Sequence, residues 1–123
     1  HDIIYQMSIR QHHISLKNAW NGIIWSLRTQ PNFKIHFTLA LFVVLLGLFY
    51  QISHVEMTIL ILTIVFGLGV EMVNTSIEAM TDLITTDWKE DAKIAKDVSA
   101  GMMLMTAIGT VVVALFIFYP RIF

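Results

Sequence analysis

The chain is organised as three long apolar runs joined by short polar connections. The apolar runs cover residues 33–50, 57–70 and 98–119. A helix needs about 20 predominantly apolar residues to cross the hydrocarbon core of a bilayer, and shorter runs of about 17 residues still suffice. With the polar residues that continue the second and third runs, the pattern predicts three membrane-spanning helices at 33–50, 55–84 and 90–119.

A fourth, amphipathic helix is predicted before the first spanning helix, at residues 14–28. Apolar residues recur there at helical spacing: Leu16, Ala19, Trp20, Ile23, Ile24 and Leu27. Such a pattern is typical of a helix that lies in the membrane interface, with Trp20 at the level of the headgroups. The preceding residues, 1–13, are polar, rich in histidine and without clear periodicity. We interpret them as a mobile or surface segment rather than a metal site, because no third ligand has helical spacing. Pro31 is expected to end or turn the chain.

A stripe of polar residues follows the second apolar run directly. Continued as a helix at about 100° per residue, Glu71, Asn74, Glu78 and Asp82 fall on one narrow face. Three carboxylates so close to lipid repel one another and are costly, so a cluster of this kind usually binds cations or moves protons.

The residue types suggest a division of roles. Glu71, at the membrane boundary, is the candidate general base, and Glu78 is the candidate Mg²⁺ ligand, since Mg²⁺ takes one or two carboxylates together with phosphate oxygens and water. Asn74 lies between them and could orient either. Lys96, at the start of the third spanning helix, supplies positive charge for a phosphate.

Structural explanations compete with these roles. Glu71 and Glu78 could instead form helix–helix hydrogen bonds within an oligomer, and Asp82 could serve solvation alone. Lys93 and Asp97 are four residues apart, which also fits a simple surface ion pair. Asp87 could be no more than a helix cap, because Asp87 and Glu90 have the spacing of a capping box.

Composition and charge placement agree with a membrane protein. Of the 123 residues, 56% are hydrophobic and 14% charged, so the chain reads as one integral membrane domain, residues 1–123. The formal net charge of −1 identifies no partner, and no nucleic-acid partner is expected. Seven basic residues flank the side that carries the N-terminus and the acidic stripe, and only Arg121 lies on the other: Arg10, Lys17, Arg28, Lys34, Lys89, Lys93 and Lys96. This imbalance predicts that the N-terminus and the stripe are cytoplasmic.

The acidic motif resembles a known family. Glu71-x-x-Asn74-Thr75-Ser76-Ile77-Glu78-x-x-x-Asp82, followed by Ala95-Lys96-Asp97, is similar to the small prokaryotic diacylglycerol kinases, which include the undecaprenol kinases of Gram-positive bacteria. The segments 82–85, 93–101 and 119–121 look more like the undecaprenol kinase branch.

The resemblance implies an all-α, multi-pass protein of the bacterial cell membrane that forms a homotrimer with active sites shared between subunits. It implies transfer of the γ-phosphate of ATP, with Mg²⁺, to a lipid hydroxyl at the cytoplasmic interface. Glu71 would be the catalytic base and Asn74 a supporting polar group. The nucleotide contacts would be Glu78, Asp87, Trp88, Lys89, Lys96 and Asp97. Candidates for contact with the lipid substrate are Glu71, Trp20 and Ala100.

One position departs from the family pattern. The family usually carries a glutamate that shares the metal with the residue matching Glu78, and here that position is Gln30. An amide binds Mg²⁺ more weakly than a carboxylate and adds no charge, so Gln30 puts the level of activity in question.

The reading from the sequence is therefore a lipid kinase that converts undecaprenol to undecaprenyl phosphate. The alternatives are a diacylglycerol kinase that makes phosphatidic acid, a catalytically weak lipid-binding relative, and an oligomer that conducts protons or cations. Against conduction, residues 57–70 give the second spanning helix no polar lining along its outer part.

Overall fold

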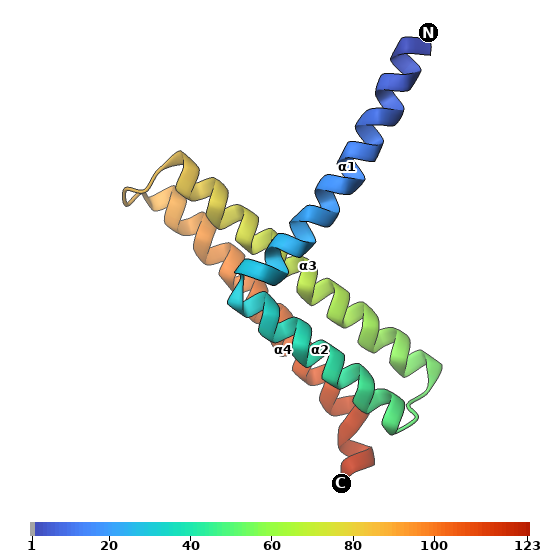
Figure 1. Ribbon diagram of the computed structural model, residues 1–123. Helices are drawn as coiled ribbons and strands as arrows, with labels where there is room; N and C mark the ends of the chain where they lie inside the picture. Colours follow the sequence, from blue (N-terminus) through green and yellow to red (C-terminus); the bar gives the residue numbers. More distant parts are fainter. Residues whose placement is uncertain (1) are drawn as a thin grey trace. The chain divides into compact units, whose positions relative to one another are not determined.

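The computed structural model describes the backbone of residues 2–123 and the side chains of residues 15–123, and all its regular elements are α-helices (Figure 1). The helices are α1 (Asp2–Thr29), α2 (Pro31–Phe49), α3 (His54–Ile84) and α4 (Glu90–Ile122). Three of them, α2, α3 and α4, are long and apolar enough to cross a membrane. The prediction of an all-α fold with three spanning helices is confirmed.

The N-terminal helix is longer than the predicted 14–28 segment. It begins at Asp2, so the backbone of the stretch interpreted as a surface segment is helical, while its side chains lie outside the described residues. Neither glycine nor proline occurs before Gly22, so nothing in the sequence breaks the helix earlier. The chain divides into two compact units, one up to Ile35 and one from His36 to Phe123.

Proline and capping residues set several helix ends. Pro31 is the first residue of α2, a position where its missing N–H costs no hydrogen bond, so the helix begins at Pro31 rather than at Phe33. Ser53 caps α3 in a reciprocal capping box with Glu56. The box expected from Asp87 and Glu90 is absent, because Lys89 is the N-cap of α4 and makes no side-chain capping bond.

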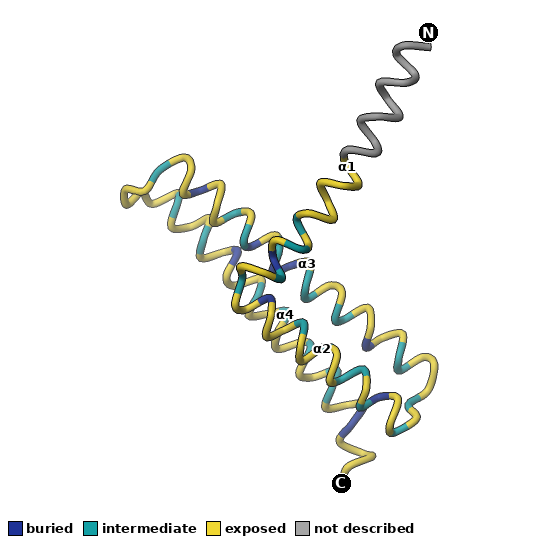
Figure 2. The backbone as a smooth tube through the Cα atoms, in the orientation of Figure 1, coloured by how far each residue is buried: buried dark blue, intermediate teal, exposed yellow. Residues whose placement is uncertain are grey.

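Within the second unit, α3 and α4 run antiparallel and pack along each other (Figure 1). Part of α2 joins them near the start of α3 and the end of α4, through a small core of Leu60, Ile117 and Phe118. Few residues of these helices are buried (Figure 2), and large apolar side chains such as Phe42, Leu62 and Phe116 are more than half exposed. Surfaces of this kind are expected where lipid or other membrane chains cover the helices.

Arg121, near the end of α4, holds this helix against the start of α3. Its guanidinium donates to both carboxylate oxygens of Glu56, at 2.7 and 2.8 Å, and to the carbonyl oxygen of Ile117 at 2.7 Å. The last helix therefore continues to Ile122 and does not end at Tyr119 as expected. Pro120 lies inside its last turn, where a missing N–H removes a single hydrogen bond.

Candidate functional site

The polar stripe of α3 points toward its neighbouring helices, but burial changes along it. Glu71 and Asn74 are buried, whereas Glu78 and Asp82, further toward the C-terminal end of α3, are exposed. Two of the four residues contact α4 directly. The stripe therefore begins inside the helix packing and ends at the polar end of the helix pair.

The two contacts with α4 differ in character. Ser99 donates a buried hydrogen bond of 2.6 Å to the side-chain oxygen of Asn74. One turn earlier on α4, Lys96 forms an ion pair of 2.6 Å with Asp82, and the carboxylate of Glu78 adds electrostatic attraction at Lys96. Both partners of the ion pair are about half exposed, so water screens it and its contribution to stability is small. Together the contacts fix how the stripe faces α4.

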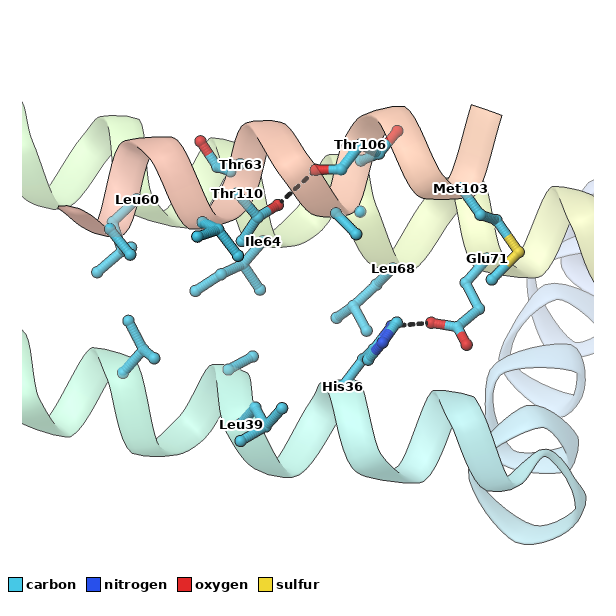
Figure 3. Close-up of a pocket in the computed structure, with 16 residues that line it drawn as sticks. His36, Leu39, Leu60, Thr63, Ile64, Leu68, Glu71, Met103, Thr106 and Thr110 are labelled. Carbon is cyan, nitrogen blue, oxygen red and sulfur yellow. Dashed lines mark hydrogen bonds and ion pairs between the residues drawn. The ribbon is translucent and has the colours of Figure 1, made fainter. Parts of the chain in front are cut away.

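Glu71 contacts α2 instead of α4. One of its carboxylate oxygens, Oε2, forms an ion pair with Nδ1 of His36, and neither oxygen accepts a hydrogen bond from the residues that the structure describes. Figure 3 shows the two side chains facing each other at one end of a groove. A buried carboxylate without hydrogen bonds is costly, so Glu71 stays the main candidate for a functional group on α3.

The groove lies between α2, α3 and α4 and has a volume of about 230 Å³. Its walls are mostly apolar, with Leu39, Leu60, Leu68 and Met103 among them (Figure 3). Three threonines also line it, and each donates its hydroxyl proton to a carbonyl one turn earlier in its own helix: Thr63 to Ile59, Thr106 to Met102 and Thr110 to Thr106. The groove is thus mostly apolar along its length, and its ionisable side chains lie only at the His36–Glu71 end.

A second, polar cavity of about 380 Å³ lies where α3 meets α4 through the connecting loop. Asp82 of the polar stripe lines it. Five residues predicted as nucleotide contacts line it as well: Asp87, Trp88, Lys89, Lys96 and Asp97. Lys93 also lines it and forms the expected i, i+4 ion pair with Asp97. Residues from two helices and a loop therefore line one polar cavity that contains both basic and acidic side chains.

Other predicted site residues lie apart from these two cavities. Glu78 is exposed on α3, and Ala100 is exposed on α4; neither lines a described cavity. Trp20 and Gln30 belong to the first compact unit, where Trp20 is exposed and the amide of Gln30 donates to the hydroxyl of Thr29 at 3.2 Å. Their roles stay predictions.

The sequence analysis missed His36. It stands near the start of an apolar run, residues 33–50, in which Lys34 is the only charged residue. An ionisable side chain within a membrane helix usually has a partner or a function, so this position carried a signal. The identity of the partner, 35 positions further along the chain, could not be read from spacing.

Comparison with known proteins agrees with this architecture. The model of the prokaryotic diacylglycerol kinase family matches residues 17–118. An undecaprenol kinase of Bacillus subtilis is 35% identical over 108 residues, which is 88% of each chain. A diacylglycerol kinase of Synechocystis is 34% identical over 101 residues, which cover 81% of this chain and 58% of that protein. The chain therefore belongs to the prokaryotic diacylglycerol kinase family and is a lipid kinase of the membrane.

Proposed function

We propose that the protein transfers the γ-phosphate of ATP to the hydroxyl group of undecaprenol and releases undecaprenyl phosphate. The observation that carries the proposal is the buried Glu71 carboxylate at the polar end of an apolar groove. A lipid alcohol needs that combination, because its chain must stay in an apolar environment while its hydroxyl meets a base.

The chemistry of the groove favours a polyprenol over a diacylglycerol. A lipid tail gains little on moving from the bilayer into an apolar groove, so selectivity depends on polar groups near the hydroxyl. A diacylglycerol carries two ester carbonyls there, and the threonine protons of the groove are already bonded to backbone carbonyls. Each carbonyl buried without a donor costs about 1 kcal/mol or more. A polyprenol has only hydrocarbon beyond its hydroxyl.

In the proposed reaction, Glu71 accepts the proton of the lipid hydroxyl as that oxygen bonds to the γ-phosphorus. The bond from the γ-phosphorus to the bridging oxygen breaks, and ADP leaves. Lys96 faces the negative charge that develops on the departing phosphates, and Asp87, Trp88, Lys89 and Asp97 surround the nucleotide in the polar cavity. Asn74, held by Ser99, keeps the α3–α4 contact fixed beside the base.

The residues present fit a magnesium ion that arrives with the nucleotide. Glu78 and Asp82 lie one turn apart and are exposed, which suits an ion whose remaining ligands are phosphate oxygens and water. Among the described side chains, no three acidic or histidine groups gather closely enough to hold a metal alone. Glu78 would hold the ion, which would neutralise charge on the phosphates during transfer. Gln30 stands at the position where the family pattern has a second metal ligand.

We further propose a homotrimer with shared active sites, oriented with the N-terminus and the polar cavity in the cytoplasm. The basic residues near the cavity and the single Arg121 at the opposite end support that orientation. The exposed apolar faces of α2, α3 and α4 leave room for neighbouring subunits, and the exposed Glu78 is placed where a second chain could complete its surroundings.

The acceptor is tested by comparing two alcohols at saturating Mg·ATP. Purified protein in mixed micelles is given undecaprenol or dioleoylglycerol, and labelled lipid phosphate is measured. We expect kcat/KM to be at least about 30-fold higher for undecaprenol, since two unpaired ester carbonyls cost about 2 kcal/mol or more. A preference for dioleoylglycerol, the acceptor class suggested by the name of the Synechocystis relative, would select the second candidate function. Failure to phosphorylate either alcohol would overturn the proposal.

The metal role of Gln30 is tested by Gln30→Glu. A second carboxylate beside the ion should lower the Mg²⁺ concentration that gives half-maximal velocity by about tenfold and raise kcat, because a carboxylate binds Mg²⁺ more strongly than an amide. The matched control is Gln51→Glu, the same change in the turn between α2 and α3. If Gln30→Glu leaves the Mg²⁺ dependence unchanged, the metal is completed by other residues.

A further inference from the structure

We propose that His36 positions the catalytic base: its imidazole holds Oε2 of Glu71 so that Oε1 is presented to the lipid hydroxyl, and it is the group through which the reaction's proton leaves. The proposal rests on the function proposed above and adds a residue to it. Its starting point is the ion pair between Nδ1 of His36 and Oε2 of Glu71 at the polar end of the groove.

The two oxygens of Glu71 are in different situations. Oε2 faces the imidazole, whereas Oε1 has no hydrogen-bond partner and no ion pair among the described residues. A carboxylate that is 2% exposed would normally have both oxygens satisfied. An alcohol whose chain lies in the groove would bring its hydroxyl to this end, where Oε1 is the acceptor that remains available.

No other described side chain that lines the groove could replace His36. Among the lining residues, α2 contributes His36 as its only titratable group, α3 contributes Glu71, and α4 contributes none. The α4 residue nearest this end in Figure 3 is Met103, which has no charge to offer. The imidazole is therefore the one titratable lining group that faces the buried carboxylate.

Exposure separates the two partners as well. The Glu71 side chain is 3% exposed and that of His36 is 45% exposed. His36 also stands within two turns of Asn32 and Lys34, polar residues that place this part of α2 at the membrane boundary. At the membrane boundary, the imidazole is therefore the member of the pair that water would reach.

This difference in exposure bears on the route by which the reaction's proton leaves the site. The alcohol and ATP give a lipid phosphate, ADP and one proton. The O–H bond of the alcohol breaks, its oxygen bonds to phosphorus, and its proton moves to Oε1 of Glu71. The His36–Glu71 pair then holds one proton more than before. It returns to its starting state by losing one proton to water, and the exposed imidazole is the member that water contacts.

The test compares His36→Ala and His36→Gln with wild type and with His54→Ala, a matched histidine at the other end of the second unit, where α3 begins. Purified proteins are assayed with undecaprenol and Mg·ATP between pH 5.5 and 9. For both His36 variants we expect kcat to fall about 10- to 100-fold, because positioned proton transfer contributes at least that much. KM values for both substrates should stay within about twofold, and His54→Ala should behave like wild type.

Two readouts separate positioning from a structural role. The pH dependence of kcat should differ between wild type and both His36 variants, because the imidazole no longer takes part in the proton transfer. Added imidazole at millimolar concentration should raise the rate of His36→Ala by at least about threefold. It should leave the rate of Glu71→Gln unchanged.

The possible results distinguish the role of His36 from the kinase function itself. A wild-type pH profile and kcat in both His36 variants would overturn the inference while the kinase function stands. So would a loss that appears only as a raised KM with no rescue. If His36→Ala does not fold as judged by its thermal unfolding, the kcat and pH profile of His36→Gln decide. Inactive wild-type protein would instead count against the proposed function itself.

Discussion

Glu71→Gln is expected to abolish phosphotransfer while leaving the protein folded. The amide keeps the size of the side chain but cannot accept the hydroxyl proton, so we expect kcat to fall by about 10³-fold or more. The assay is formation of labelled undecaprenyl phosphate from Mg·ATP, followed over hours to detect a small residual rate. The thermal unfolding midpoint should stay the same or rise, because a neutral amide is less costly to bury than a carboxylate whose oxygens lack hydrogen bonds.

The control for this experiment is Glu90→Gln. Glu90 is exposed in the first turn of α4 and lines neither cavity, so the same chemical change there should leave the rate near that of wild type. Substantial turnover by Glu71→Gln, beside an active Glu90→Gln, would remove Glu71 from the role of base. The alternative role raised for Glu71, a hydrogen bond between helices of an oligomer, predicts the opposite pattern, with loss of assembly accompanying loss of activity.

The sequence predicts the stripe because a helix repeats every 3.6 residues. That period alone places Glu71, Asn74, Glu78 and Asp82 on one face, and the contacts of Asn74 and Asp82 with α4 agree with it. The period does not reveal how deeply each residue is buried. Burial depends on how α2 and α4 pack around α3, so the change from the buried Glu71 to the exposed Glu78 appears only in the structure.

Contacts within one helix could be predicted from the sequence, whereas contacts between helices could not. Charge spacing correctly indicated the Lys93–Asp97 pair, since both residues lie on one helix. The pair of His36 with Glu71 joins two helices, and no spacing rule relates them. The start of α2 and the end of α4 were misjudged. Proline is tolerated in the first turn of a helix, so α2 begins at Pro31. The last turn of α4 contains Pro120 and is held by the contacts of Arg121 with Glu56 and Ile117.

Lys96→Met is expected to lower kcat about 10²- to 10³-fold with little change in stability. The methionine keeps the apolar stem of the side chain but removes the charge that, in the proposed reaction, would face the phosphates in the polar cavity, and one such group typically contributes that much to transition-state stabilisation. The ion pair with Asp82 is about half exposed and screened by water, so the free energy of unfolding should hardly change.

Asp82→Asn separates the two roles of Lys96. This variant breaks the same ion pair but keeps the lysine, so a purely structural lysine would make both variants equally impaired. We expect Asp82→Asn to lose less than about tenfold in kcat, and Lys96→Arg to recover part of the rate lost in Lys96→Met, because a guanidinium keeps the charge but not the shape. Equal losses in Lys96→Met and Asp82→Asn would show that Lys96 acts by holding α3 against α4. The charge on the departing phosphates would then have to be met by Lys89 or Lys93, the other lysines that line the cavity.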